Sequence, residues 1–375
     1  MIGRETVAYI DIDKYLYNLD FLQKHTKTKI MPVLKANAYG HGATFLAKAA
    51  IKEGYDMIAV AFLEEALNLL EQGIKIPILI FNYFSPKDLK EVLEFSEFIK
   101  PTITSSYFLE KACVILGSDV KKFKFHINLD TGINRIGIKK AEIPKLVSLI
   151  KKYNVSIEGI YSHFANADEK DDFTHVQFDR FITLSKYFES EGIYSKIKHI
   201  SNSAGALFFP NYSLDYVRAG IATFGLQPSV THIEPNLKPI LELKSVVSSV
   251  HELLPEDTVG YGRTYKAKKR NKNCCNPYRY ADGYFRNLSN KGEVLINGKR
   301  CKILGRVSMD QIVVDISYNN NVSIGDEVVI IGKQKDDNIS AEEVAKRAQT
   351  INYEITSKIT QRVQRRYLKG GNYFE

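Results

Sequence analysis

The stretch "KIMPVLKANAYGHGA", Lys29 to Ala43, passes from an apolar run into a segment of small residues that contains a single lysine, Lys35. A short apolar run of this kind predicts a buried strand, and the small residues after it predict a tight connection. Seven similar runs alternate with helical patterns as far as Phe224. The predicted strands are Ile30–Leu34, Met57–Ala61, Ile76–Phe81, Phe98–Ile103, Phe123–Leu129, Ile157–Tyr161, Ile197–Ile200 and Tyr216–Ile221.

Eight strand–helix units over about 200 residues are typical of a (β/α)8 barrel of the TIM type. A doubly wound open sheet is the alternative topology for the same alternation. We therefore expect an α/β fold whose N-terminal barrel spans residues 1–232.

The pattern of apolar and polar residues changes after Thr231. Residues 241–250 alternate between apolar and polar side chains, and Asn297-Gly298 is a strong signal for a type I′ hairpin turn. "VSIGDEVVIIG", residues 322–332, is interpreted as a second hairpin, and Ser340 with Glu343 predicts a helix that begins with a capping box. These patterns predict a C-terminal β-strand domain over residues 233–375.

The composition is that of an ordinary globular protein, with 44% hydrophobic and 25% charged residues among 375. The N-terminal residues do not resemble a signal peptide and no apolar run is long enough to span a membrane, so we expect a cytoplasmic protein. Four cysteines without ligand spacing indicate reduced thiols rather than a metal site. The net charge of +9 comes without a nucleic-acid recognition motif, and indicates solvated basic loops that favour anionic ligands.

Polar residues fall where the predicted strands end. Lys35 follows the first strand, His163 the sixth and Ser203 the seventh, while Arg218 lies in the eighth. Each residue alone is also consistent with a structural role, such as a buried histidine or a helix cap. In a barrel, however, the carboxyl ends of all strands meet at the face where active sites lie, so these groups are expected to form one site.

The segment "SNSAGAL", Ser201 to Leu207, predicts hydroxyl donors followed by the start of a helix, and Gly220 allows a close approach of backbone N–H groups. Both features favour a bound phosphate. Lys35 is then either a counter-ion or a covalent nucleophile. An ordinary lysine is neutral in only about one molecule in 2,500 at pH 7, and desolvation among small neighbours increases that fraction. Pyridoxal phosphate, which combines an aldehyde with a phosphate, is one ligand that satisfies both features.

Nine motifs occur in the order found in the alanine racemase family, and together they cover nearly the whole chain. They are "VLKANAYGHG", "LDTGINRIG", "SHFANADE", "HISNSAGAL", "VRAGIATFGLQPS", "VGYGRTY", "YADG", "GRVSMDQ" and "TINYE". The chain therefore resembles that family. The resemblance implies a fold-type III pyridoxal 5′-phosphate enzyme with an N-terminal barrel, a C-terminal β domain and a head-to-tail homodimer that shares its active sites.

The resemblance also implies roles for individual residues. Lys35 matches the lysine that binds the cofactor covalently and acts as a base on one face of the substrate. Tyr261 matches the tyrosine that acts on the opposite face from the other subunit, so that two bases exchange the Cα proton of L-alanine or D-alanine. Arg218 matches the arginine that faces the pyridine nitrogen. The remaining implied residues are Tyr39, His163, Asn202, Ser203, Gly220, Ile221 and Tyr353 around the cofactor, Arg135, Met309 and Tyr280 around the substrate, and His199 and Asn128 in the supporting network.

Three positions depart from the family pattern. Asn128 stands where many members carry a carbamylated lysine, and we hypothesise a bound chloride beside Asn128 and Arg135 in its place. Ser308 replaces a usual cysteine, which is a small polar change. Arg279 replaces a glycine close to "YADG", which affects the expected access of substrate. The role of His41, which belongs to the pattern, is open.

Racemisation of alanine, supplying D-alanine for peptidoglycan, is the function that the resemblance favours. A serine racemase or a racemase of broad specificity is the first alternative. A decarboxylase of diaminopimelate or ornithine would share the lysine and the phosphate site, but would not be expected to carry "GRVSMDQ" or Tyr261 in this setting. A non-catalytic carrier of pyridoxal phosphate would resemble the barrel alone. No metal is expected in the site.

Overall fold

The structure, a computed structural model, describes residues 5–319 and 321–374. Contacts along the chain divide it into two compact units, a barrel unit and a β-rich unit. The barrel unit consists of Tyr15–Ala38 and Ala43–Lys238. The β-rich unit contains the residues up to Lys14, the short segment Tyr39–Gly42 and the chain from Pro239 onward. The units are therefore not the two contiguous stretches that the sequence suggests, because two N-terminal segments pack in the β-rich unit.

The barrel unit contains all eight predicted strands in parallel pairing. Six of them, β3 to β8, form one continuous sheet in chain order, and β2 pairs with β9. Their short apolar sequences explain why they are buried on both faces, as strands inside a barrel must be. The strands are β2 (Lys29–Pro32), β3 (Ile58–Val60), β4 (Ile78–Ile80), β5 (Ile99–Ile103), β6 (Phe125–Asn128), β7 (Ile157–Tyr161), β8 (Ile197–His199) and β9 (Tyr216–Ala219).

Two backbone contacts connect the six-stranded sheet to the β2–β9 pair and close the strands into a ring. Val33, just after β2, forms a parallel bridge with Ala59 of β3. On the other side the backbone N–H of Arg218 in β9 donates to the carbonyl oxygen of Ser201 after β8, at 3.0 Å. The alternative of an open doubly wound sheet is thereby excluded, and the predicted (β/α)8 barrel is confirmed.

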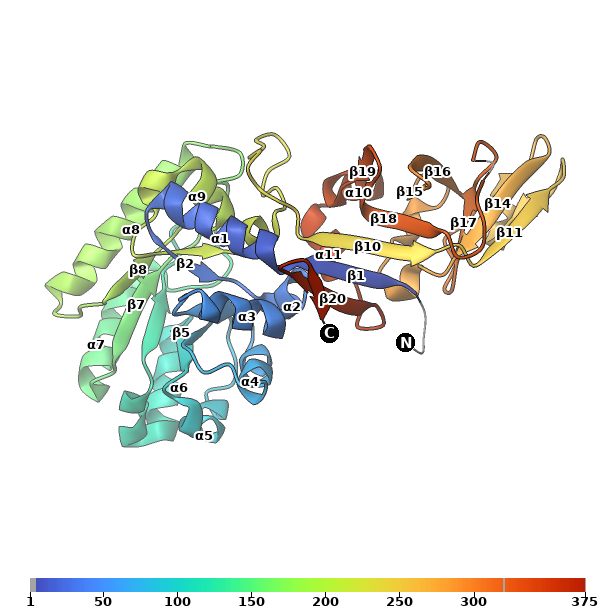
Figure 1. The fold of residues 1–375 in the computed structure, drawn as a ribbon. Helices are drawn as coiled ribbons and strands as arrows, with labels where there is room; N and C mark the ends of the chain where they lie inside the picture. The colour runs from blue at the N-terminus through green and yellow to red at the C-terminus, as the bar shows by residue number, and fades with distance from the viewer. Residues whose placement is uncertain (1–4, 320, 375) are drawn as a thin grey trace. The chain divides into compact units, whose positions relative to one another are not determined.

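Helices separate the successive barrel strands and lie outside them, as α6, α7 and α8 show in Figure 1. Each connects the carboxyl end of one strand to the amino end of the next, which leaves all carboxyl ends at one rim. The helices up to residue 208 are α1 (Ile12–Thr26), α2 (Lys35–Tyr39), α3 (Ala43–Lys52), α4 (Leu63–Glu71), α5 (Asp88–Glu91), α6 (Ser106–Leu116), α7 (Ile143–Tyr153), α8 (Phe173–Ser190) and α9 (Ser203–Phe208).

The β-rich unit is built on an 11-stranded sheet in which the first strand of the chain takes part. Strand β1 (Val7–Asp11) pairs antiparallel with β10 (Leu241–Val246) and parallel with β20 (Gln364–Lys369), and Figure 1 shows it between them. The other strands of the unit are β11 (Ser249–Leu253), β12 (Thr258–Val259), β13 (Tyr265–Lys266), β14 (Asn271–Asn276), β15 (Glu293–Ile296), β16 (Lys299–Leu304), β17 (Ile312–Asp315), β18 (Glu327–Gln334), β19 (Asp337–Ile339) and β21 (Asn372–Phe374).

The predicted turn at Asn297-Gly298 is confirmed, since it joins β15 to β16 with φ of 53° and 78°. The second predicted hairpin, residues 322–332, is wrong. Those residues form a turn followed by the single strand β18, whose five buried residues Val328–Gly332 make one continuous core segment. The hairpin that does form joins β18 to β19, and its turn lies at residues 335–336.

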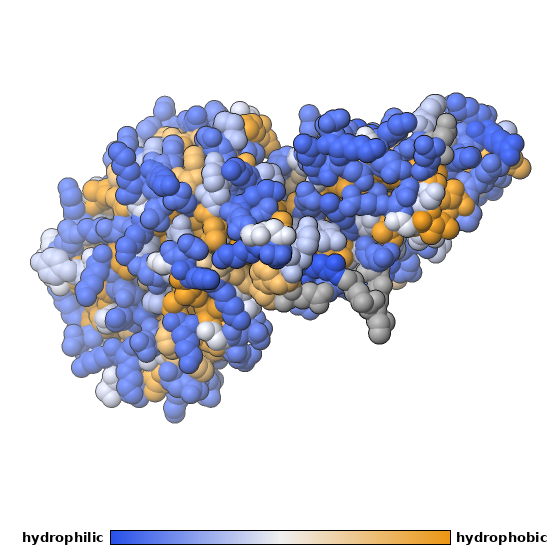
Figure 2. Space-filling view, in the orientation of Figure 1, coloured by the Kyte–Doolittle hydropathy of each residue, from blue (hydrophilic) through white to orange (hydrophobic). Residues whose placement is uncertain are grey.

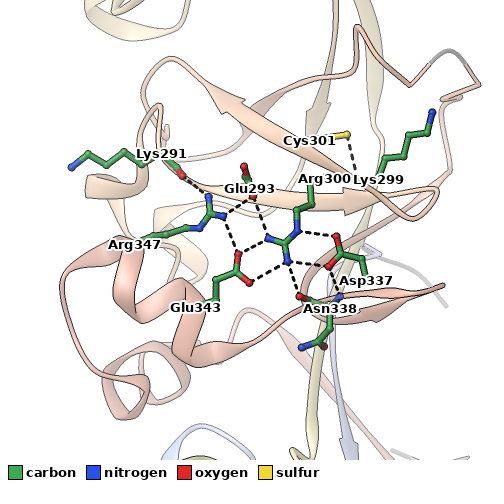
Figure 3. Close-up of polar contacts among 9 residues, drawn as sticks. All are labelled: Lys291, Glu293, Lys299, Arg300, Cys301, Asp337, Asn338, Glu343 and Arg347. Atoms are coloured by element: carbon green, nitrogen blue, oxygen red, sulfur yellow. Dashed lines mark hydrogen bonds and ion pairs between the residues drawn. The ribbon is translucent and has the colours of Figure 1, made fainter. Parts of the chain in front are cut away.

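The predicted helix after Ser340 is α10 (Ala341–Ala348), and a second helix, α11 (Asn352–Ser357), follows it. Ser340 caps α10, because its hydroxyl accepts from the N–H of Glu343 at 3.1 Å. The Glu343 carboxylate binds elsewhere. It contacts the guanidinium groups of Arg300 and Arg347, in the network drawn in Figure 3.

Arg300 is the centre of that network. Its guanidinium binds Asp337 of β19 through two hydrogen bonds of 2.8 and 3.0 Å, and also contacts Glu293 and Glu343 (Figure 3). One planar side chain therefore connects strands β15, β16 and β19 with helix α10. Bidentate pairing of this kind requires the guanidinium fork, which lysine lacks.

We expect Arg300→Lys to destabilise the β-rich unit by about 1 kcal/mol, because the charge remains while the bidentate contact to Asp337 is lost. Thermal unfolding followed by circular dichroism measures the change. Lys302→Met, at an exposed position of the same strand, is the matched control and should change stability by less than about 0.5 kcal/mol. Equal melting temperatures for Arg300→Lys and the wild type would contradict the prediction.

Apolar side chains fill the interiors of both units, while hydrophilic residues cover most of the face shown in Figure 2. The four cysteines are free, and burial raises the pKa of Cys113 to about 11 and that of Cys274 to about 12. Such thiols are protonated and unreactive at neutral pH. Within the described residues, no helix has both the length and the apolar character needed to cross a membrane.

Candidate active site

Lys35 is the third residue after β2, and its side chain is half-buried. The chain then makes a left-handed turn, in which Ala36, Asn37, Ala38 and Tyr39 all have φ between 51° and 54°. Left-handed backbone costs about 1–2 kcal/mol per residue for residues other than glycine. This turn cannot be predicted from residues 36–39, because left-handed positions are usually marked by glycine and none of these four residues is a glycine.

Specific hydrogen bonds compensate for the strain in the turn. The Glu65 carboxylate accepts from the N–H of Ala36 at 2.6 Å and also caps the start of α4. The Asn37 side chain accepts from the N–H of Ala43 at 2.9 Å. Glu65 was not among the predicted site residues. The only signal for it was an acidic residue in the first turn of a predicted helix, where a capping role is usual.

The electrostatic environment of Lys35 favours its neutral form. Burial lowers the pKa of Lys35, and the positive charges of Arg135 and Arg218 lower it further, against an opposing effect of Glu65. An amine must be neutral to act as a nucleophile or as a base. The barrel rim thus brings together the predicted residues Lys35, Arg135 and Arg218, and the two guanidinium groups create a site for an anion such as a phosphate or a carboxylate.

Arg218 is buried and is held by four hydrogen bonds. Its Nη1 lies 2.7 Å from Nδ1 of His199, and its Nη2 donates to the carbonyl oxygens of Ser162 at 2.6 Å and Ile200 at 3.1 Å. Nη2 also lies 3.2 Å from Nδ1 of His163. Burial lowers the pKa of Arg218 to about 10, so the guanidinium stays charged at neutral pH. Its orientation is fixed by groups from two strand ends, those of β7 and β8.

Both ring nitrogens of His163 lie close to a hydrogen-bond donor. Arg218 Nη2 points at its Nδ1, and the Asn202 side-chain nitrogen lies 3.3 Å from its Nε2. A neutral imidazole accepts through one nitrogen only, so His163 can accept from Arg218 or from Asn202 but not from both. Burial and the nearby charges of Arg218, Arg135 and Lys35 hold the pKa of His163 well below its usual range. The ring is therefore neutral.

The loops after β8 and β9 meet at Ser203. Its hydroxyl accepts from the backbone N–H groups of Gly220 at 3.1 Å and Ala222 at 3.3 Å, and Asn202 caps α9 by accepting from Gly205 at 2.9 Å. Ile221 lies between the two donors. The predicted set Asn202, Ser203, Gly220 and Ile221 is thus brought together at the rim of the barrel, where hydroxyl and N–H groups converge.

Asn128 ends β6 and is buried, whereas Arg135 is exposed on the loop that follows. The loop returns to the strand at Ile138, whose N–H donates to the Asn128 carbonyl oxygen at 2.7 Å. Gly137 is favoured there because its φ is 123° and a Cβ atom would lie 3.0 Å from the backbone nitrogen of Asp130. The structure therefore places a neutral amide, and no lysine, on the strand that leads to Arg135.

The predicted residues Tyr39 and Tyr353 belong to the β-rich unit, where their ring centroids lie 6.0 Å apart. The segment around His41 packs tightly in the same unit. A side chain at Gly40 would overlap the Thr356 carbonyl, and one at Gly42 would overlap the Tyr367 hydroxyl. His41 is fully buried between these glycines. It therefore has a packing role in the β-rich unit.

Tyr261, Tyr280 and Met309 are also in the β-rich unit, and they lie on neighbouring loops. The N–H of Tyr280 donates to the Ser308 carbonyl oxygen at 3.4 Å, and Gly260 lies against the backbone of Arg306. All three side chains are exposed, with 73% of Tyr261, 38% of Tyr280 and 54% of Met309 accessible. Apolar groups gathered at exposed loops are typical of a contact surface.

Arg279 turns inward, contrary to the expectation that it would act at an entrance. Its Nε lies 3.0 Å from the buried carboxylate of Asp282, and its Nη1 donates to the Asp310 carbonyl oxygen at 3.1 Å. Arg279 therefore ties the loop of Tyr280 to the loop of Met309. The sequence could not reveal this pairing, because Asp282 is also part of a common turn motif.

No group of three or more His, Cys, Asp or Glu side chains that could hold a metal gathers within residues 5–319 and 321–374.

Comparisons with known proteins agree with this geometry. The family model for the alanine racemase N-terminal domain matches residues 10–228, and the model for the alanine racemase C-terminal domain matches residues 240–367. The alanine racemase of Carboxydothermus hydrogenoformans is 40% identical over 97% of this chain and 100% of its own length. That of Clostridium tetani is 38% identical over 98% of this chain and 97% of its own length.

A solved structure is similar throughout. The crystal structure of alanine racemase from Bacillus anthracis with bound L-Ala-P matches with a TM-score of 0.94 at 35% identity, and the match covers 100% of this chain and 98% of that one.

Proposed function

The chain belongs to the alanine racemase family and is an amino-acid racemase, and we propose that it interconverts L-alanine and D-alanine by a two-base mechanism with pyridoxal 5′-phosphate. The observation that carries the proposal is the position of Lys35, half-buried beside Arg135 and Arg218 with a lowered pKa. Supply of D-alanine for peptidoglycan, in the cytoplasm, is the biological role that we propose for this activity.

The residues at the rim fit the cofactor. Its phosphate needs hydrogen-bond donors and positive charge, and its aldehyde needs a neutral amine. The Ser203 hydroxyl accepts from the N–H groups of Gly220 and Ala222 and so has its own O–H to donate to a phosphate, while Lys35 supplies the amine. We propose that Lys35 holds the cofactor covalently, that Arg218 faces its ring nitrogen and that His163 and Asn202 line the site. The proposed phosphate ligands are Tyr39, Ser203, Gly220, Ile221 and Tyr353.

When bound, pyridoxal phosphate supplies an electron-withdrawing ring that stabilises negative charge at the substrate Cα. Residues of the chain then transfer the protons and hold the cofactor ring in position. Lys35 holds or releases a proton at its Nζ on one face, and Tyr261 of the partner subunit does the same at its hydroxyl on the other. Arg218 stays cationic and therefore disfavours a proton on the ring nitrogen, which limits side reactions. Its contacts to His199 and His163 hold it in that position.

We propose that the substrate carboxylate binds Arg135 and the backbone of Met309 of the partner subunit, and that Tyr280 narrows the entrance. Because Asn128 provides no negative charge beside Arg135, a chloride ion is the proposed counter-ion there. Anomalous scattering from crystals grown with bromide tests this site. Anomalous density beside Asn128 and Arg135 is expected, and a water molecule alone would reject the proposal.

The exposed position of Tyr261, on the β-rich unit while Lys35 is on the barrel unit, supports the proposal of a homodimer with shared sites. We expect two inactive variants, Lys35→Ala and Tyr261→Phe, to restore activity when they are unfolded and refolded together. Random pairing gives one half mixed dimers, each with one intact site of two, so about a quarter of wild-type activity should return. No activity in the mixture would contradict shared sites, and each variant refolded alone is the control.

Arg135 should also control the titration of Lys35. In the cofactor-free protein, covalent attachment of pyridoxal phosphate should accelerate with rising pH, with a midpoint below the value of about 10.4 of a free lysine. Arg135→Gln removes a cation that lowers the pKa of Lys35, so its midpoint should move to higher pH. Lys139→Gln, which removes an exposed cation from the end of the same loop, is the control. An unchanged or lower midpoint for Arg135→Gln would contradict the assignment.

The experiment that tests the proposed function is a racemisation assay of the purified enzyme with alanine, serine, lysine and arginine. We expect alanine to be the preferred substrate. Preference for serine would support the alternative of a serine racemase of the same fold, and bound cofactor without racemisation of any amino acid in the panel would reject the proposal.

A further inference from the structure

A buried row of polar side chains crosses the interior of the barrel away from the rim. Nη1 of Arg218 contacts Nδ1 of His199 at 2.7 Å, and Nε2 of His199 contacts Nδ1 of His126 at 3.1 Å. Nε2 of His126 then lies 3.5 Å from a carboxylate oxygen of Glu158. Both histidines are fully buried and Arg218 is 3% exposed. The row runs from the carboxyl end of β9 to the second residue of β7, close to the opposite end of the barrel.

The arrangement fixes the direction of every hydrogen bond in the row. A guanidinium can only donate, so Nδ1 of His199 must accept and its proton must be on Nε2. That proton is donated to Nδ1 of His126, which places the proton of His126 on Nε2. An ionised carboxylate can only accept, so Glu158 is the group that terminates such a row. Reversing one imidazole would bring two donors face to face.

The last contact, between His126 and Glu158 at 3.5 Å, is long for a hydrogen bond, but each of its two atoms is the nearest possible partner of the other. Nε2 of His126 and this oxygen of Glu158 are both buried. Among the described residues, neither atom forms a hydrogen bond with a third group. Two lysines, Lys100 at 3.9 Å and Lys124 at 3.8 Å, face the same carboxylate from neighbouring strand ends. Burial raises the pKa of Glu158, but the hydrogen bond with His126 and the charges of these lysines bring it below its usual value. The carboxylate is ionised at neutral pH.

The sequence of β7 makes space for the row. A side chain at Gly159 would overlap the imidazole of His126, so the ring occupies the volume that residue 159 leaves empty. The ring of Tyr161, on the same strand, stacks on His199 with centroids 4.8 Å apart and lies under the guanidinium of Arg218. Gly159 and Tyr161 thus bound the two imidazoles from the same strand.

We propose that Glu158 and His126 are positioning residues for Arg218: the carboxylate sets both histidine tautomers and so keeps Nδ1 of His199 as an acceptor for the guanidinium. The kinetic part of this proposal rests on the proposed function, because it supposes that Arg218 acts on the bound cofactor. The assignment of the tautomers does not rest on the proposed function, because the protons on these buried rings can be located without any turnover of substrate.

Glu158→Gln is the test variant, since it keeps the shape and removes the charge. The lysines would attract the carbonyl oxygen of the new amide, which leaves its N–H groups facing His126. Nε2 of His126 would then accept, its proton would move to Nδ1, and His199 would in turn present a proton to Arg218. We expect kcat of the holoenzyme to fall about tenfold or more, while KM for alanine changes less than about twofold.

Nitrogen NMR of protein labelled with 15N-histidine reads the tautomers directly, because protonated and unprotonated ring nitrogens differ widely in chemical shift. The chain has 8 histidines, and single substitutions assign the signals of His126 and His199. The wild type should carry its proton on Nε2 in both rings, and Glu158→Gln should move it to Nδ1. Glu97→Gln, an exposed change near Lys100 at the same end of the barrel, should leave both tautomers and kcat unchanged.

A proton on Nδ1 of either ring in the wild type would overturn the proposal, and this measurement stands even if Glu158→Gln does not fold. Unchanged tautomers in a folded Glu158→Gln variant would also overturn it, as would an unchanged kcat. A wild-type enzyme that shows the expected tautomers but does not racemise alanine would reject the proposed function and leave the assignment of the row intact.

Discussion

Lys35→Ala is expected to abolish racemisation, with a loss of more than about 10⁴-fold, because one substitution removes both the covalent anchor of the cofactor and the base on one face of the substrate. The half-buried amine with a lowered pKa is the group at the rim that combines these abilities. The visible absorption band of the lysine-bound cofactor should disappear as well. Absorbance spectra and a coupled assay for D-alanine measure the two effects on the same sample.

The control for this variant is Lys48→Ala, at an exposed position in α3. It should retain wild-type activity and the absorption band. More than about a tenth of wild-type activity in Lys35→Ala, in a preparation free of wild-type enzyme, would show that another residue provides the base.

Tyr261→Phe is expected to slow racemisation by about 10²–10⁴-fold, because it deletes the proton carrier on the second face and leaves Lys35 intact. The two enantiomers have equal free energies, so kcat/KM must remain equal in the two directions. The asymmetry should therefore appear in exchange of the Cα proton with solvent. One enantiomer, the one that presents its proton to Lys35, should still exchange, and the other should exchange slowly.

Proton NMR in D2O with each enantiomer separately measures that exchange. Tyr318→Phe, which removes an exposed hydroxyl elsewhere in the β-rich unit, is the control and should behave as the wild type. Equal slowing of exchange for both enantiomers would count against the assignment of Tyr261 to the opposite face. The absorption band should persist, since Tyr261 is not proposed to hold the cofactor.

The barrel could be predicted from the sequence because most of its strands contain a short apolar run, and β3, β4 and β5 are buried along their whole length, so the local pattern and the final environment agree. Strand β1 shows the limit of that reasoning. Residues Val7–Asp11 pair with β10 and β20, which are more than 200 residues away, and their own sequence does not specify which sheet they join. The hairpin predicted for residues 322–332 is wrong because the turn at Gly325 leads into the single strand β18 and does not join two strands.

The candidate site was predictable to the extent that it lies at strand ends. Lys35, Ser203 and Arg218 could be placed at one rim from the topology alone, since parallel strands of a barrel have their carboxyl ends together. The left-handed turn after Lys35 could not be predicted, because it depends on the distant carboxylate of Glu65 and has no glycine within it. Glu158 could not be predicted either, because it is the second residue of β7 and therefore lies near the amino ends of the strands, where active-site residues are not expected.

The central claim is that this enzyme racemises alanine with one base on each face, and racemisation of L-alanine in D2O tests it most directly. The Cα proton of the substrate and the isotope at Cα of the product are followed by NMR and by chiral chromatography with mass detection. We predict that D-alanine appears and carries deuterium at Cα, because a second group, in exchange with solvent, returns the proton. D-alanine that keeps the original Cα proton would contradict the two-base mechanism, and the absence of D-alanine would contradict the racemase itself.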